Sequence, residues 1–344
     1  MKQAVLNLML ASGAFAPFRL ANRRKALILT YHRFSRSDEE SATSARAFAG
    51  QLEYLFTHYT IVPLSLLAES LTSGAELAPG TVALTIDDGY RDAYEIAFPI
   101  LRRYRAPATI FVVTDFVDQQ TWLWTDKLRY LTARTLAKEF TVQLDGGELR
   151  FELKDRAARL AAAERVNSEL KRLPERVKDE TILRLASSLG VRLPELPPRE
   201  FSALTWSQVR EMEAAGIEIG SHTLTHPILN QLDDEPLRRE LRESRSRLAA
   251  ALGRQVEMFC YPNGDYDARV LREVARAGYR FAVTIGCGFT RQGSHPLALR
   301  RMTVEPDLAH FAQSTSGFEQ VKNRLRFGFS RTGEEPAGGP RPTL

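Results

Sequence analysis

Residues 82–90, Val-Ala-Leu-Thr-Ile-Asp-Asp-Gly-Tyr, join a short apolar run to two adjacent carboxylates and a glycine. A continuous apolar run of this length is typical of a strand buried on both faces, as in a parallel sheet. Two neighbouring aspartates raise each other's pKa in a partly buried place, and a bound cation would relieve their repulsion. Because Asp-Asp-Gly is also good turn chemistry, Asp87 and Asp88 alone do not decide between a solvated turn and a site.

Apolar runs of the same kind recur along the chain, and helical patterns separate most of them. The other predicted strands are 26–31, 108–113, 217–220, 256–261, 281–285 and 297–304. The predicted helices are 43–58, 91–104, 206–215, 236–252 and 268–277. Alternating strands and helices over this length predict an α/β fold with a parallel sheet, most simply a barrel.

One stretch, from about 118 to 200, breaks this alternation and is rich in Lys, Arg, Glu, Leu and Ala. Its patterns predict helices at 126–140, 156–173 and 175–189, and a hairpin at 140–153 with a turn at Asp145-Gly146-Gly147. Prolines 194, 197 and 198 mark its exit. We interpret the stretch as a mainly helical insertion in one barrel loop.

The two ends of the chain differ from the middle in composition. Residues 1–25 are apolar and then basic, a pattern that fits a secretory signal, a plain leader helix or a membrane-surface anchor. The barrel is expected over 26–310, with a C-terminal extension over 311–344. From about 333 that extension is rich in Gly and Pro, which predicts disorder at its end.

Composition excludes some classes of protein. The chain has 344 residues, is 44% hydrophobic and carries a formal charge of +5, so it is globular and modestly basic. No Cys/His finger or aromatic RNA-binding signature indicates nucleic acid, and acidic glycans or anionic lipid headgroups suit the charge equally well. Cys260 and Cys287 make no disulfide framework and are expected to be buried free thiols. Oligomeric state stays open, and a membrane or envelope location is favoured over the cytoplasm.

A second polar segment, Ser-His-Thr-Leu-Thr-His-Pro at 221–227, also follows an apolar strand. Histidines four residues apart fall on one face of a helical turn, a spacing that suits two imidazoles on one metal ion. Two unrelated polar histidines are the alternative. The carboxyl ends of parallel barrel strands share one face, where active sites are built, so His222 and His226 are expected near Asp87 and Asp88.

A third segment, Phe-Cys-Tyr-Pro-Asn-Gly at 259–264, takes a strand into a turn. Such a turn can aim backbone N–H groups at a developing oxyanion, or can be a plain connection.

The first two segments together supply an aspartate and two histidines. Such a set leaves metal positions open for water and substrate, as hydrolytic zinc sites require.

These three segments resemble the motifs of polysaccharide deacetylases with a NodB homology domain, carbohydrate esterase family 4. Residues 85–89 (TIDDG) are similar to the first motif, 221–226 (SHTLTH) to the second and 259–264 (FCYPNG) to the third. The resemblance covers about 26–307, interrupted by the insertion. It implies a distorted (β/α)7 barrel of the NodB type. The segment Tyr31-His32-Arg33-Phe34 looks like the exopolysaccharide-associated branch.

The resemblance also implies a role for each matched residue. Asp87 matches the general base, and Tyr261 matches the residue whose backbone N–H stabilises the oxyanion. The metal ligands would be Asp88, His222 and His226. The implied cofactor is a divalent metal, Zn²⁺ first, with Co²⁺ and Ni²⁺ as alternatives.

The chain departs from the family pattern at two points. The third motif has no arginine to orient the base, and the usual C-terminal Leu-x-His is missing, since His295 and His310 have other neighbours. By resemblance, Arg301 would hold Asp87 and His32 would face the same cleft as a candidate acid. Trp122, Trp124 and Asp126 resemble part of an insertion found in the exopolysaccharide-associated branch. Two roles are open for them: lining a sugar-binding wall, or packing in a core.

The sequence therefore predicts a hydrolase acting on carbon–nitrogen (non-peptide) bonds in linear amides. It would remove N-acetyl groups from N-acetylated sugars of a polysaccharide or its precursor. The alternatives are a non-catalytic glycan-binding protein on the same fold and an O-acetyl esterase. An envelope or capsular polysaccharide, or its lipid-linked precursor, is the favoured glycan, with chitin oligomers and peptidoglycan left open.

Overall fold

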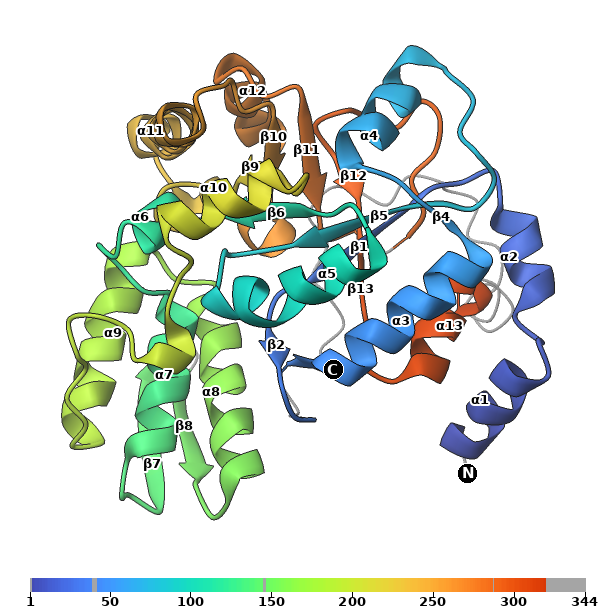
Figure 1. The fold of residues 1–344 in the computed structure, drawn as a ribbon. Coiled ribbons are helices and arrows are strands. Elements are labelled where there is room, and N and C mark those ends of the chain that lie inside the picture. The colour runs from blue at the N-terminus through green and yellow to red at the C-terminus, as the bar shows by residue number, and fades with distance from the viewer. Residues whose placement is uncertain (1, 39–41, 145–146, 287, 320–344) are drawn as a thin grey trace.

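The computed structural model describes residues 2–38, 42–144, 147–286 and 288–319, and its centre is one parallel sheet (Figure 1). All of the strand pairs in this sheet are parallel. The first six barrel strands in chain order are β1 (Leu27–Tyr31), β5 (Thr81–Ile86), β6 (Thr109–Val112), β9 (Glu218–Ser221), β10 (Met258–Cys260) and β11 (Phe281–Thr284). Each lies within one of the predicted runs or extends it by one residue, so the parallel α/β prediction is confirmed.

The last predicted strand closes the sheet in two pieces. β12 (Leu299–Arg300) pairs with β11, whereas β13 (Met302–Thr303) pairs with β1 at the other end of the strand order. A single residue, Arg301, separates the two pieces, and it is fully buried. The prediction of one continuous strand at 297–304 was wrong in this respect. The split lets one segment join both edges, so the sheet is a nearly closed barrel of the NodB type.

Side chains alternate across each barrel strand. Ile28, Ala83, Phe111, Cys260 and Val283 belong to one buried cluster, which α4 (Leu64–Ser73) also joins. Their neighbours on the same strands pack in a second cluster with the surrounding helices. Because strand side chains alternate, Thr85 and Asp87 follow Ala83 on its side of the sheet. This alternation aims the first aspartate of the motif into the barrel.

The predicted barrel helices are present (Figure 1). They are α3 (Ala45–His58), α5 (Phe98–Tyr104), α10 (Trp206–Ala214), α11 (Asp234–Leu252) and α12 (Ala268–Arg276). The predicted helix 91–104 instead begins with a π-helical turn, η1 (Ala93–Ala97). Pro99 lacks the N–H that would bond the carbonyl of Glu95, which explains why the regular ladder fails there.

Several short elements were not predicted. They are β2 (Phe34–Ser35), β3 (Thr43–Ser44), β4 (Thr60–Ile61), α4, α6 (Thr114–Val117), η2 (Arg199–Phe201), η3 (Leu229–Gln231) and η4 (Pro262–Gly264). β4 pairs with the first two residues of β5, and β6 pairs with the last two. This offset distorts the barrel between β5 and β6.

The insertion has a hydrophobic core of its own. It contains α7 (Trp124–Arg134), the hairpin β7 (Glu139–Leu144) and β8 (Gly147–Glu152), α8 (Arg156–Leu170) and α9 (Glu175–Ser188). Figure 1 shows it, mostly in green, extending from one side of the barrel. The predicted helix 126–140 ends earlier, because residues from 139 pair in the hairpin. Residues 145–146 of the predicted turn lie outside the described residues.

Both ends of the described chain pack together. The C-terminal helix α13 (Leu308–Ser316) contacts α1 (Lys2–Ala11), α2 (Ala16–Asn22) and α3. The boundary predicted at 310 falls inside α13, where Phe311 is buried, and 320–344 and Cys287 lie outside the described residues. Among described helices, none alone is long and apolar enough to cross a membrane; by length and composition, only the bent pair at 3–11 and 16–22 could.

Candidate active site

The two aspartates of the first motif are buried where β5 ends. Asp87 is 1% exposed and Asp88 is 7% exposed, which rules out the solvated turn. The backbone N–H of Asp87 donates to the carbonyl of Tyr31 (2.9 Å) and so continues the pairing with β1. Gly89 has a φ of 81°, and a Cβ there would lie 2.9 Å from a methyl of Val112, so only glycine fits. The turn therefore fixes both carboxylates inside the protein.

The histidine segment is an irregular loop after β9 rather than the predicted helical turn. Thr223 and His226 have positive φ values of 72° and 67°, which non-glycine residues rarely adopt. Such residues cost about 1–3 kcal/mol each and persist only where their surroundings hold them. The strain therefore points to a loop whose shape is imposed by its neighbours.

Glu240 of α11 is the main support of this loop. Its carboxylate accepts hydrogen bonds from the N–H groups of Leu224 (2.9 Å) and Thr225 (3.0 Å), and from the hydroxyl of Thr225 (2.7 Å). Burial raises the pKa of Glu240, and the bonds from Thr225 and Leu224 oppose this shift. The sequence analysis did not predict this role, because Glu240 is one of several acidic residues on a highly charged helix.

We expect Glu240→Ala to weaken zinc binding roughly 10- to 100-fold, as loss of a residue that orients metal ligands does. The reason is that two buried N–H groups lose their acceptor and the strained loop relaxes. Competition with a fluorescent chelator measures the affinity, and circular dichroism checks the fold. Glu243→Ala, on the same helix and bonded to Arg239, is the control. Equal zinc affinity in the two variants would contradict the assignment.

The loop brings both histidines to Asp88. The Nε2 atoms of His222 and His226 lie 3.3 and 3.5 Å from the same oxygen, Asp88 Oδ1. All three residues are buried, and their ligand atoms lie within 4.8 Å of one another. The three predicted metal ligands therefore converge on one point.

The tautomer of His222 indicates what belongs at that point. Its Nδ1 lies 2.8 Å from the carbonyl oxygen of Cys260, and a carbonyl only accepts, so Nδ1 carries the hydrogen. Nε2 then presents a lone pair to the carboxylate oxygen of Asp88. Two acceptors at this distance need a proton or a cation between them. The donor set of one carboxylate and two imidazoles fits a divalent metal such as zinc.

The ionisation of the group suits metal binding. Burial, together with the charge of His222, lowers the pKa of His226 to about 3. Burial alone would raise the pKa of Asp88, but without a metal a proton on His222 Nε2 takes the place of the cation, and its hydrogen bond holds the pKa of Asp88 well below its usual range. Near neutral pH, Asp88 is anionic and His226 neutral, the forms that bind metals.

Asp87 is held by Arg301. The guanidinium donates two parallel bonds, Nη1 to Oδ1 and Nη2 to Oδ2, each 2.7 Å long. It also donates to the Thr85 hydroxyl (3.0 Å) and the Thr284 carbonyl (3.2 Å). Burial would raise the pKa of Asp87, but the charge and bonds of Arg301 lower it below its usual range. The structure thus brings together the two residues that the sequence paired.

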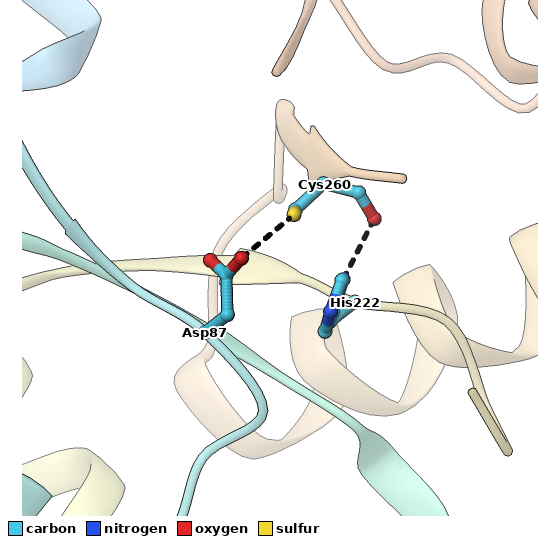
Figure 2. A group of neighbouring side chains, drawn as sticks. All are labelled: Asp87, His222 and Cys260. Atoms are coloured by element: carbon cyan, nitrogen blue, oxygen red, sulfur yellow. Dashed lines mark hydrogen bonds between the residues drawn. The ribbon is translucent and has the colours of Figure 1, made fainter. Parts of the chain in front are cut away.

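Cys260 contacts both Asp87 and His222, through its thiol and its carbonyl oxygen (Figure 2). Its Sγ is 3.5 Å from Asp87 Oδ2 and 3.1 Å from Arg301 Nη2. It is a buried free thiol, as predicted, and burial raises its pKa. The small side chain at this third-motif position leaves room for a guanidinium that arrives from the last strand.

Asp87, His222 and Cys260 form a second group with ligand atoms within 4.8 Å. Both Asp87 oxygens already accept bonds from Arg301, and the same guanidinium bonds the thiol. A cation in this group would be repelled by that positive charge. The group of Asp88, His222 and His226 is therefore the better metal site.

The positions of His32 and Tyr261 bear differently on the roles predicted for them, those of catalytic acid and oxyanion donor. His32 lies at the site, with Nε2 3.7 Å from Asp87 Oδ2 and a side chain that is 37% exposed. The backbone N–H of Tyr261 instead donates to the Val283 carbonyl (3.2 Å), and its hydroxyl to the Leu297 carbonyl (2.8 Å). The pairing of β10 with β11 continues through Tyr261, so this geometry argues against its N–H as the oxyanion donor.

Other residues singled out by the sequence are not part of the candidate metal-binding groups. Trp122 and Trp124 are buried, which favours core packing over a sugar-binding wall. Asp126 is also buried, and its carboxylate accepts the Tyr90 hydroxyl at 2.6 Å. His310 bonds Asp307 beside it, and His295 accepts the N–H of Leu297.

The sequence is similar to those of known deacetylases. A sequence model of the family described as polysaccharide deacetylase matches residues 74–194 and 199–282, more than half of the chain. YxkH of Bacillus subtilis (strain 168), a protein named for polysaccharide deacetylation, is 23% identical over 289 residues, covering 83% of this chain and 73% of YxkH.

Two solved structures share the fold. The deacetylase PplD of Streptococcus pyogenes, in complex with acetate, has a TM-score of 0.57 and 20% identity, over 86% of this chain and 97% of that one. IcaB from Ammonifex degensii has a TM-score of 0.56 and 21% identity, over 84% of this chain and 97% of that one.

Proposed function

Because the chain belongs to the polysaccharide deacetylase family, we propose that it removes N-acetyl groups from the N-acetylated sugars of a polysaccharide or its precursor, with a divalent metal, preferably zinc. One observation carries the proposal. The group of Asp88, His222 and His226 lies beside a carboxylate, Asp87, that Arg301 holds in place. A set of metal ligands next to an oriented base is the arrangement that hydrolytic metal sites use.

The roles of the residues follow from their environments. A metal ion held by Asp88, His222 and His226 would supply Lewis-acid chemistry, polarising an acetyl carbonyl and lowering the pKa of a water molecule. Asp87, kept ionised by Arg301, accepts the proton of the attacking water. His32 lies on the exposed side of Asp87 and, when protonated, donates to the departing amine.

The same geometry bears on the two alternative functions. A protein that only binds glycans has no need of a buried carboxylate and its own arginine, which cost desolvation free energy. An O-acetyl esterase needs less help from an acid than an amidase does, because an amine leaves only after it is protonated. His32 beside Asp87 therefore supports the N-deacetylase over both alternatives.

Acetate release from N-acetylglucosamine tetramers tests the proposal. We expect chelator-treated protein to be inactive and zinc to restore activity. We expect Asp87→Asn to lower kcat by roughly a hundredfold or more, since general-base catalysis contributes about 10²- to 10⁴-fold. Zinc content should stay unchanged in that variant. Activity on O-acetylated xylose oligomers alone, or full activity in Asp87→Asn, would contradict the proposal.

A further inference from the structure

A cavity of about 980 Å³ lies between the barrel and the insertion. Most of its lining comes from residues 33–36 after β1, residues 91–96 around η1, the facing parts of α7 and α8 with the cap residue Asp155, and residues 199–202. None of Asp87, Asp88, His222 and His226 lines it. Its volume is that of an ordinary ligand pocket, and nothing in the proposed mechanism uses it.

The walls of this cavity are unusually rich in arginine: eight arginines face four carboxylates. Three of these carboxylates form ion pairs with arginines of the lining. Arg33 bonds Asp92 at 2.6 Å, Arg199 bonds Glu95 at 3.2 Å, and Arg134 bonds Glu200 at 3.0 Å. The fourth, Asp155, caps the N-terminus of α8. Arg91 shares Glu95, and Arg129 pairs with Asp126 and Glu164, which do not line the cavity. The remaining positive charge of the lining lies on Arg36 and Arg159.

These two arginines keep their charge for different reasons. Nη1 of Arg159 donates to the backbone carbonyls of Thr132 and Thr135, at 2.6 and 2.9 Å. These neutral acceptors do not cancel its charge. Arg36 is exposed, and no carboxylate within the described ranges forms an ion pair with it. Guanidinium groups in this state bind carboxylates and phosphates through charge-assisted, often paired hydrogen bonds.

The cavity also has apolar surface on which a sugar ring can pack. Tyr130 and Phe201 line it together with Ile96 and Leu160. Apolar and aromatic side chains beside charged groups are found in sites that orient a polar ligand. The combination suits a sugar that carries an acidic substituent better than it suits a free inorganic ion.

The cavity adjoins the active site along the chain. Arg33 follows His32, whose Nε2 is 3.7 Å from Asp87 Oδ2. Arg91 comes three residues after Asp88, a span of at most about 11 Å of backbone. The Arg33 guanidinium also lies over the ring of Tyr90, 4.1 Å from its centre. A glycan with one unit at Asp87 therefore has a neighbouring unit within reach of the cavity.

We propose that this cavity binds the carboxylate or phosphate of a sugar unit that flanks the N-acetylated one, so that the preferred substrate is an anionic glycan. The inference rests on the proposed deacetylase function for the identity of the neighbouring unit. Arg36 and Arg159 supply the positive charge, and the aromatic side chains Tyr130 and Phe201 support the ring.

Two tetrasaccharides of equal length test the inference. Hyaluronan tetrasaccharide alternates N-acetylglucosamine with glucuronate, whereas the N-acetylglucosamine tetramer is neutral. Calorimetry on the zinc-loaded protein is expected to show roughly tenfold tighter binding of the anionic one, the size of one charge-assisted contact. This preference should decrease as salt is added. The gain in affinity from N-acetylglucosamine to N-acetylglucosamine 1-phosphate measures the effect of a phosphate. Comparing it with the gain between the two tetrasaccharides reports whether phosphate or carboxylate is the better anion.

Arg36→Glu is expected to abolish the preference, and Arg36→Lys to keep most of it. Arg176→Glu, on the exposed face of α9, is the control and should change nothing. Equal binding of anionic and neutral ligands, unchanged by Arg36→Glu, would overturn the inference even if the enzyme deacetylates both. Arg36-dependent binding of an anionic ligand without any acetate release would uphold the cavity and refute the deacetylase function.

Discussion

Asp88→Ala is expected to lose bound zinc and to lower kcat/KM for acetate release roughly 10³-fold or more, since Lewis-acid assistance contributes several kcal/mol. The Nε2 atoms of both histidines converge on Asp88 Oδ1, so this substitution removes the centre of the group. Metal analysis after dialysis and an acetate assay measure the two effects. His226→Ala should behave in the same way, because it removes one of three ligands.

Two controls make this experiment decisive. His310→Ala removes a histidine whose ring bonds Asp307, away from Asp88, and it should leave zinc content unchanged. Cys260→Ala tests the competing group, in which the thiol would be a ligand. We expect it to keep its zinc. Full zinc content in Asp88→Ala together with zinc loss in Cys260→Ala would move the metal to Asp87, His222 and Cys260 and contradict our assignment.

The sequence was sufficient to predict the parts of the site that depend on local chain geometry. Asp87, Asp88 and the two histidines each follow the end of a buried strand, and parallel strands bring such ends to one face. Gly89 marks the first turn because a side chain there would clash with Val112. The family resemblance then separated the two aspartates by role, which no spacing argument could do.

The parts that depend on distant contacts were harder to predict. Glu240 lies 16 residues from Leu224 and looks like any acidic residue on a helix, yet it holds the histidine loop. The π-helical turn and the split between β12 and β13 arise from hydrogen-bond partners that a linear pattern does not reveal. The pairing of the Tyr261 N–H with Val283 is likewise a matter of sheet register.

The prediction for Arg301 came from the family resemblance, but its position in the structure depends on distant contacts. The resemblance required an arginine for Asp87 and found none in the third motif. The structure supplies it from the point where the barrel closes, because the break after β12 turns residue 301 inward. The residue at which the barrel closes therefore also holds Asp87, the base in our proposal, so we expect its loss to affect both stability and activity.

Arg301→Met is expected to destabilise the protein by about 3–5 kcal/mol, because it leaves the Asp87 carboxylate buried without its partner. Urea unfolding measures this loss. Arg300→Met is the matched control, since Arg300 is adjacent and exposed and should change stability little. The double variant Arg301→Met, Asp87→Asn removes the unpaired charge as well, and it should recover much of the stability. An Arg301→Met midpoint equal to that of Arg300→Met would refute the argument.

The dependence of this effect on pH has a definite sign. In the native protein Arg301 keeps the pKa of Asp87 below its usual range, so the pair stabilises the fold above the unfolded pKa of about 3.9, and this contribution is lost as pH falls through the folded pKa. Without Arg301, burial raises that pKa instead. The destabilisation should then be largest near neutral pH and shrink as acid protonates Asp87. For the same reason, the acidic limb of the kcat/KM profile should move to higher pH in Arg301→Met and stay in place in Arg300→Met.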